Sequence, residues 1–450
     1  MFCKSGFSGL SPRSALTVLA AALLAVAFTK VSSAGAETLA SFCAKLSCTD
    51  GTSPSADLAM DTAGHVFGIT AGGGNHSSGS IFELALDAET GKWRRTMLHG
   101  FCAAGYPCAD GSSPAGRLVV DVNGNVYGTA TGGGAGQGGT VFRLSYDSSH
   151  GWWMLKVLYA FCSSANCADG KAPASGLTYQ GQSAGAPYDG VSALYGTAQA
   201  GGAHGGGVAF AIVPQPATGK WSEKELYSFC ARQHCSDGAQ PWQSLWMDVH
   251  GALYGVTANS AQANAVAFRL KPGTKGAWTE TVLHRFCIDG CSTGSSPNAL
   301  IADASGKLFG SASGGGAHGS GVLFALMPDG ESWHYRVLHH FCAQQNCLDG
   351  AMPLSVLALD GQGNLYGTTY YGGRNLVDRD EKGGGTIFRL SPAGQYRIVH
   401  HFCSLYACAD GEYPKAGVLM DGSGGLFGTT QLGGRYTSYF QGGVAYRVSD

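Results

Sequence analysis

The chain has 450 residues, of which only 13% are charged, and its formal net charge is -2. This balance excludes the strongly basic surface that nucleic-acid binding needs, and no polybasic or amphipathic segment predicts a membrane-surface protein. Glycine accounts for 71 residues and cysteine for 15, which indicates a turn-rich fold with many candidate disulfides.

The first 36 residues have the pattern of a secretory signal peptide. Lys4 and Arg13 precede the apolar run Ala15–Phe28, and the small residues Ala34-Gly35-Ala36 follow it. The run is too short to span a bilayer comfortably, and no second run of that kind follows. We therefore predict a signal peptide over 1–36, a mature domain over 37–450 with no membrane span, and a secreted or periplasmic location.

Seven close cysteine pairs divide the mature chain into repeats. Each pair follows a phenylalanine and precedes a glycine and a proline, and these phenylalanines lie 55 to 68 residues apart. The pairs are Cys43 with Cys48, Cys102 with Cys108, Cys162 with Cys167, Cys230 with Cys235, Cys287 with Cys291, Cys342 with Cys347, and Cys403 with Cys408. In an exported protein this even set predicts seven local disulfides rather than zinc or redox sites. Only Cys3, inside the predicted signal, has no partner.

Each repeat contains four short segments with the apolar alternation of β-strands. In the second repeat these segments are 116–121, 126–129, 139–144 and 152–161, separated by Asn-Gly, a glycine run and a polar loop. Four antiparallel strands repeated seven times predict an all-β, seven-bladed β-propeller, in which radial repetition protects the sheet edges.

The two ends of the mature chain predict how the ring closes. Glu37–Phe42 matches the fourth strand of a repeat, and the final segment, 443–448, matches the third. We therefore predict that an N-terminal strand completes the C-terminal blade. We expect a monomer.

An Asp-Gly step follows six of the cysteine pairs and allows two interpretations. The aspartates are Asp50, Asp110, Asp169, Asp237, Asp349 and Asp410. They could contribute to calcium sites, but one carboxylate per loop is too few for a hard cation without further ligands. Turn capping by aspartate and a positive φ at glycine explain the step more simply. We predict no metal and no cofactor.

The glycine-rich loop between the second and third strands should lie on the same face as the cysteine loops. One equivalent position in this loop carries His76, His204 and His318 in alternate repeats, and Tyr436 in the last. Three histidines at one register could bind a metal or act as a base. We favour a repeat consensus with solvated imidazoles, because no carboxylate that would orient them is visible.

The sixth and seventh repeats depart from the pattern in this same loop. The sixth carries Tyr370, Tyr371 and Arg374, and the seventh carries Arg435 and Tyr436. Arginine beside tyrosine suits a carboxylate or sugar ligand, although charged insertions are often ordinary solvated loops. Because binding residues concentrate on irregular loops, these residues and the three histidines are the candidate ligand site.

Three segments of the sixth repeat resemble a known family. Leu-Tyr-Gly-Thr-Thr at 365–369, Gly-Gly-Thr-Ile-Phe-Arg-Leu at 384–390 and Val-His-His-Phe at 399–402 resemble the GloVer-type tandem repeat of bacterial choice-of-anchor proteins. The resemblance extends over nearly the whole mature chain. It implies an exported, β-propeller-like repeat protein with no established enzymatic role.

Two classes of function remain open. The first is a binding scaffold for a glycan, a cell-surface polymer or a surface protein, which requires only the ring and its irregular loops. The second is a polysaccharide lyase specific for uronates, in which Arg374 or Arg435 holds the carboxylate of the uronate. One of the three loop histidines, His76, His204 or His318, or Tyr436 would then be the base. The lack of any short catalytic motif favours binding, and the question of enzymatic activity stays open.

Overall fold

The computed structural model describes residues 35–450, without 75, 259–263, 375–382 and 436–441. The chain divides into two units, Met1–Gly35 and Ala36–Asp450, and every described strand belongs to the second, which is compact. The predicted signal peptide lies almost entirely outside the described residues. Within the described ranges, no helix combines the length and the apolar character needed to cross a membrane.

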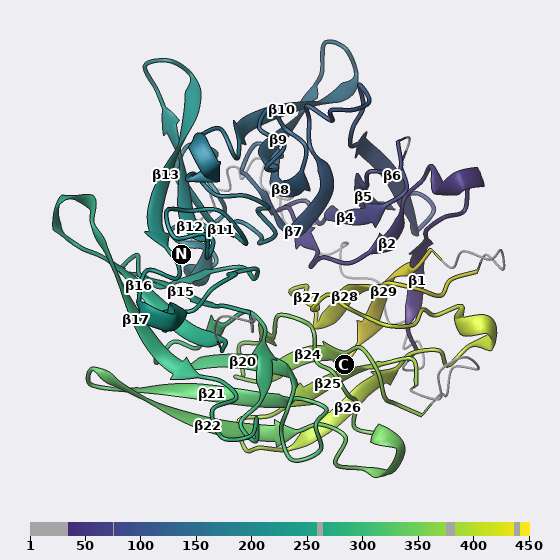
Figure 1. Cartoon of the computed structure of the whole chain (residues 1–450). Helices are drawn as coiled ribbons and strands as arrows, with labels where there is room; N and C mark the ends of the chain where they lie inside the picture. The colour runs from purple at the N-terminus through teal and green to yellow at the C-terminus, as the bar shows by residue number, and fades with distance from the viewer. Residues whose placement is uncertain (1–34, 75, 259–263, 375–382, 436–441) are drawn as a thin grey trace, which may run out of the picture. The chain divides into compact units, whose positions relative to one another are not determined.

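The second unit consists of seven antiparallel sheets that surround a common axis as the blades of a propeller (Figure 1). Blade 1 contains β2 (Thr52–Pro54), β3 (Ala59–Met60), β4 (Val66–Gly72), β5 (Ser80–Asp87) and β6 (Lys92–Gly100). Blade 2 contains β7 (Ser112–Val120), β8 (Val126–Gly132), β9 (Thr140–Asp147) and β10 (Trp152–Ala160). Blade 3 contains β11 (Leu194–Ala198), β12 (Val208–Gln215) and β13 (Lys220–Ser228). Blade 4 contains β14 (Trp246–Met247), β15 (Leu253–Val256), β16 (Val266–Pro272) and β17 (Trp278–Arg285). Blade 5 contains β18 (Ser295–Pro297), β19 (Ile301–Ala302), β20 (Leu308–Gly314), β21 (Val322–Asp329) and β22 (Ser332–His340). Blade 6 contains β23 (Ala358–Leu359), β24 (Leu365–Thr369), β25 (Thr386–Leu390) and β26 (Tyr396–His401). Blade 7 contains β27 (Leu419–Met420), β28 (Gly425–Thr430), β29 (Val444–Ser449) and β1 (Glu37–Ser41). The predicted seven-bladed β-propeller is confirmed.

Blade 3 differs from the predicted four strands. Its sheet contains three strands, and a bridge between Thr178 and Tyr195 takes the place of the innermost one. The cause is the insertion over residues 180–192, which replaces the tight first hairpin of the other blades. In blade 1 that hairpin has the regular form: Asp61 Oδ1 accepts the backbone N–H groups of Ala63 and His65.

The ring closes as the sequence predicts. Strand β1 pairs with β29 in an antiparallel ladder that places Glu37 opposite Arg447 and Ser41 opposite Val444. The backbone N–H of Phe42 then donates a 2.9 Å hydrogen bond to the carbonyl of Gly443. Blade 7 therefore contains both ends of the described chain.

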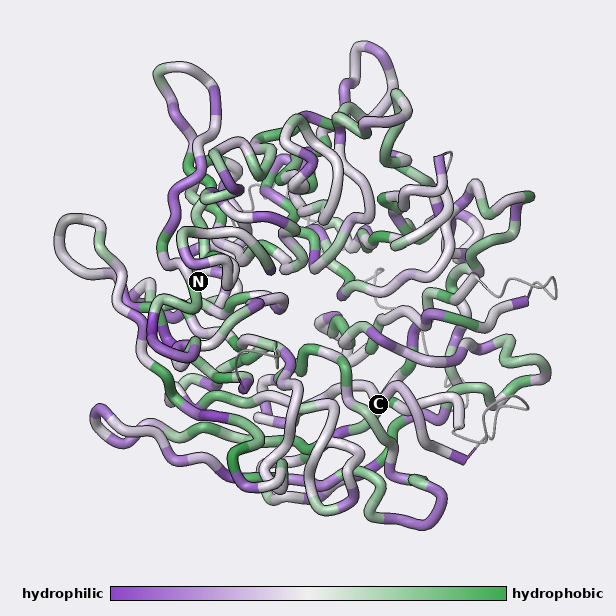
Figure 2. The backbone as a smooth tube through the Cα atoms, in the orientation of Figure 1, coloured by the Kyte–Doolittle hydropathy of each residue, from purple (hydrophilic) through white to green (hydrophobic). Residues whose placement is uncertain are grey.

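The core lies between neighbouring blades and depends on the phenylalanine that precedes each cysteine pair. Phe101, at the end of blade 1, packs edge-on against Phe142 of blade 2, with ring centroids 5.2 Å apart. Gly128 makes room for this ring, because a Cβ at that position would lie 2.6 Å from Phe142 Cζ. Hydrophilic residues run instead along outer strands such as β13, as Figure 2 shows.

The cysteine loops occupy the crossings between blades, and all seven predicted disulfides form. The structure joins each predicted pair, from Cys43–Cys48 to Cys403–Cys408. Five of the loops contain a short 3-10 turn: η1 (Leu46–Cys48), η2 (Ala165–Cys167), η4 (Gln233–Cys235), η6 (Gln345–Cys347) and η7 (Tyr406–Cys408). Two further 3-10 turns are η3 (Gln182–Ala184) and η5 (Thr274–Gly276). Seven disulfides are typical of a protein that matures in an oxidising compartment.

Candidate functional site

The inner segment of each blade carries one equivalent residue beside the propeller axis. Each residue stands directly before a buried apolar side chain, such as Leu58 in blade 1 and Leu118 in blade 2. In blade order the seven residues are Asp57, Arg117, Gly176, Ser244, Ala299, Val356 and Gly417. Two neighbouring members of this axial ring carry opposite charges, whereas the other five are neutral.

Hydrogen bonds between blades hold the axial ring in place. The Gly417 backbone N–H of blade 7 donates a 2.6 Å hydrogen bond to Asp57 Oδ1 of blade 1. The Gly176 N–H of blade 3 donates a 3.0 Å bond to Ser244 Oγ of blade 4. The Thr129 hydroxyl of blade 2 reaches the Ser175 carbonyl of blade 3 at 2.9 Å. Since these bonds join neighbouring blades, the residues around the axis are fixed relative to one another.

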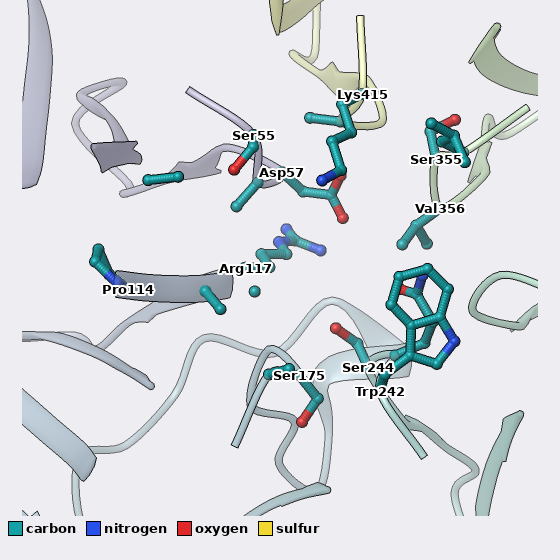
Figure 3. A pocket seen from close by; sticks show the side chains of 18 of the residues that line it. Ser55, Asp57, Pro114, Arg117, Ser175, Trp242, Ser244, Ser355, Val356 and Lys415 are labelled. Carbon is teal, nitrogen blue, oxygen red and sulfur yellow. The ribbon is translucent and has the colours of Figure 1, made fainter. Parts of the chain in front are cut away.

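A cavity of about 280 Å³ occupies the axis on the side where the chain enters the innermost strands. Besides ring residues, it is lined by Ser55, Ser113, Trp242 and Lys415. Figure 3 shows that Asp57, Arg117 and Lys415, which come from three different blades, point toward one another near its centre. These three are the charged side chains among the residues that line this cavity.

Arg117 is the most informative residue of the cavity. It is half-buried, and within the part of the chain that the structure describes it forms no hydrogen bond and no ion pair. Lys415 is exposed at the cavity and is equally without a described partner. A guanidinium presents five N–H donors and suits a planar carboxylate, so the cavity contains unused capacity for an anion.

Asp57 modulates this positive charge. Burial raises the pKa of the Asp57 carboxyl, and the Gly417 N–H and the Arg117 charge offset part of that effect. A carboxyl whose pKa is raised becomes neutral more readily, and a neutral Asp57 leaves Arg117 available to a ligand.

The three predicted histidines lie away from the axial cavity. His76, His204 and His318 are exposed on loops of blades 1, 3 and 5, and none of them lines the cavity. In the described ranges none of the three belongs to a cluster of ligand-type side chains within metal-binding reach. The one such cluster found there is Cys403, Cys408 and Glu412, whose two sulfurs are joined in a disulfide.

The other predicted site residues lie around blades 6 and 7. Tyr370 stacks on Tyr413 with ring centroids 5.0 Å apart, and its hydroxyl donates a 2.9 Å hydrogen bond to Gln431 Oε1. Tyr371 packs edge-on against Tyr370. Arg374 and Arg435 are both exposed.

The Arg374 backbone N–H lies 3.3 Å from His401 Nδ1, and burial together with the Arg374 charge lowers the pKa of His401 to about 4. Tyr436 lies outside the described residues. The role of this set in ligand binding stays a prediction.

The sequence contains a signal for the axial ring that lies outside the irregular loops. In blades 1, 2, 3, 4 and 6 the fourth residue after the proline is leucine, and the residue before that leucine is the member of the axial ring. Comparing this position across repeats would have shown Asp57 and Arg117 as departures from small or apolar residues.

Comparison with known proteins identifies the family of the repeat and a solved structure with a similar fold. A family model described as the Gloeobacter/Verrucomicrobia repeat matches residues 27–193 and 259–450, which confirms the resemblance to the GloVer-type repeat. Among solved structures, the chain is similar to Kuenenia stuttgartiensis hydrazine synthase, with a TM-score of 0.50 and 13% identity. That match covers 85% of this chain and 94% of the other, and at this identity it shows the fold alone. Comparison with curated proteins gave no match.

Proposed function

This chain belongs to the Gloeobacter/Verrucomicrobia repeat family, and we propose that it is an exported binding scaffold whose axial cavity holds a carboxylate-bearing glycan. The observation that carries this proposal is the Arg117 guanidinium, which stands half-buried in the cavity without a described partner. The ligand's carboxylate would form a bidentate pair with Arg117, and Lys415 would add a second cation.

The remainder of the cavity wall suits the hydroxyl-rich body of a sugar. The Ser55 and Ser113 side chains line the cavity and make no hydrogen bond to described residues. The Trp242 ring also lines it, and its indole Nε1 is buried without a described acceptor. Aromatic faces beside small polar groups are a common composition for sugar recognition, because rings stack on the apolar faces of pyranoses.

The proposal contains no catalytic step. The predicted lyase assigned the base to His76, His204, His318 or Tyr436, and the three described histidines do not line the cavity that contains Arg117. Binding needs only the groups that do line it, so it is the simpler function for this geometry.

Calorimetric titration with uronic-acid oligosaccharides tests the proposal. The same oligosaccharides with their carboxyl groups reduced to alcohols are the neutral comparison. We expect the carboxylated form to bind at least about tenfold more tightly, and Arg117→Ala to abolish that preference. Arg94→Ala, on the exposed outer strand β6, is the matched control for loss of one positive charge.

Two results would contradict the proposal. One is equal binding of the carboxylated and neutral oligosaccharides by the unaltered protein. The other is a carboxylate preference that survives Arg117→Ala but disappears in Arg374→Ala or Arg435→Ala, which would move the site to the irregular loops of blades 6 and 7.

A further inference from the structure

A second cavity of about 310 Å³ adjoins the first along the axis. The two share four lining residues, Asp57, Arg117, Ser244 and Val356, which therefore form the boundary between them. In each blade, the residues that line the first cavity come earlier along the inner segment, such as Ser55, whereas the second cavity also contacts residues further along it, such as Met247 of β14. The axial channel thus has two chambers with the charged pair between them.

The second chamber contains side chains from an element that only blade 3 possesses. The insertion over 180–192 includes the 3-10 turn η3, and Gln182 and Ser183 of this turn line the chamber. The turn contacts β14 of blade 4. An insertion in one blade therefore breaks the sevenfold regularity of the channel at this end.

The insertion is anchored firmly to its surroundings. Tyr188 is fully buried, and its carbonyl accepts a 2.9 Å hydrogen bond from the Val122 N–H of blade 2. The Tyr188 hydroxyl donates to the Ser192 carbonyl, and Tyr179 Oη donates to the Ala186 carbonyl. Because both arms of the insertion are tied down, the positions of the η3 side chains are set by the fold.

Gln182 is oriented as a donor within this chamber. The Thr178 hydroxyl donates a 2.5 Å hydrogen bond to Gln182 Oε1, which fixes the plane of the amide. Gln182 Nε2 then has no acceptor among the described residues. Trp246 is half-buried and lines the same chamber, and its ring packs against that of Tyr254 with centroids 5.6 Å apart. Among its lining residues the charged side chains are Asp57 and Arg117 alone, both at the boundary.

From this arrangement we propose that the channel has two subsites and that its ligand is an acidic oligosaccharide of at least two residues spanning the Asp57–Arg117 boundary. The carboxylate of one residue lies at Arg117. A neighbouring neutral sugar lies in the second chamber, where Gln182 Nε2 donates to its hydroxyl or ring oxygens and Trp246 contacts its apolar face. This inference rests on the proposed function and names the ligand class more narrowly.

Calorimetric titration with glucuronate and with two disaccharides tests the second subsite. In each disaccharide glucuronate is joined to a neutral hexose, which stands on the reducing side in one and on the non-reducing side in the other. We expect at least one disaccharide to bind fivefold or more tightly than glucuronate. Gln182→Ala should remove this gain and leave glucuronate binding unchanged, and Ser149→Ala, on an exposed hairpin, should change neither.

The outcomes separate this inference from the proposed function. Equal affinity for glucuronate and both disaccharides, or an equal loss for all ligands in Gln182→Ala, would overturn the second subsite and leave the first in place. Binding of all ligands that is unaffected by Arg117→Ala would overturn the proposed function and the subsite together.

Discussion

Tyr159 Oη donates a 2.8 Å hydrogen bond to Asp169 Oδ2, and this bond joins the outer strand of blade 2 to the far end of the disulfide loop that follows it. Asp169 also accepts the backbone N–H groups of Ser163 and Ser164, at 2.9 and 3.1 Å. The equivalent pairs elsewhere are His99 with Asp110, Tyr227 with Asp237, His339 with Asp349 and His400 with Asp410, while Arg95 pairs with Asp50. Each aspartate therefore holds a disulfide loop closed against a strand.

Replacing Asp169 should destabilise the protein, because four donors, the Ser163 hydroxyl included, lose their acceptor at a buried position. We expect Asp169→Ala to lower the free energy of unfolding by about 2–3 kcal/mol and Tyr159→Phe by about 1 kcal/mol. Urea denaturation measures both. Asp329→Ala is the control, since Asp329 and its partner His334 are both largely exposed and the pair should contribute under about 1 kcal/mol. A similar loss in Asp169→Ala and Asp329→Ala would contradict this role.

The sequence predicts these aspartates but not their partners. The Asp-Gly step indicates a capped turn, and the structure adds that the carboxylate caps the disulfide loop and meets an aromatic or imidazole group. The apolar alternation of a strand cannot show that the chain turns back to bring Asp110 within 2.9 Å of His99.

The propeller itself was predictable because its signals repeat seven times, whereas the channel depends on single departures from the repeat. Asp57 lies between the short strands β2 and β3, so no alternation of apolar residues in the sequence shows that it faces the axis. The insertion of blade 3 is visible by its length, but its path to the second chamber depends on tertiary contacts of Tyr188.

Glu223 should make the protein less stable as the pH rises. Burial raises the pKa of Glu223 to about 7, with Asp169 and Glu225 adding to the effect, and its Oε1 is buried without a described partner. Between the ordinary pKa of 4.5 and the folded value the folded state holds a proton that the unfolded state has lost, so stability falls across this window.

Glu223→Gln removes the titrating group while keeping its shape. We expect a gain of about 1–2 kcal/mol at pH 8 and no gain at pH 4, measured by urea denaturation. Part of the pH dependence will remain, because burial also raises the pKa of Glu280 to about 7. Glu331→Gln is the control, since its side chain is 97% exposed. An equal gain at both pH values would show that the effect is not electrostatic.

Asp57 should make carboxylate binding depend on pH. Burial raises the pKa of Asp57, so its charge appears only as the pH rises through that raised value. The ionised form competes with the ligand for Arg117 and repels a carboxylate, and we therefore expect the affinity for glucuronate to fall as the pH rises.

Asp57→Asn isolates this effect, because its amide oxygen can still accept the Gly417 N–H. Titrations over a pH range that begins at the ordinary carboxyl pKa of 3.8 and extends upward should give a nearly constant affinity in this variant and a declining one in the unaltered protein. Arg117 and Lys415 line the cavity together with Asp57, and Tyr446 interacts with Asp57 electrostatically. Burial keeps Tyr446 neutral in this range. Equal slopes in both proteins would assign the pH dependence to another group.

Ring closure should make Phe42 as important as a phenylalanine inside the repeat. The Phe42 ring lies 4.9 Å from that of Phe82, the same distance as between Phe161 and Phe210, and both Phe42 and Phe161 are fully buried. We expect Phe42→Ala and Phe161→Ala each to lower the free energy of unfolding by about 3–5 kcal/mol, because each leaves a cavity between two blades. Urea denaturation of the two variants gives the comparison. A loss below about 1 kcal/mol for Phe42→Ala alone would contradict an equal contribution of Phe42 and Phe161 to stability.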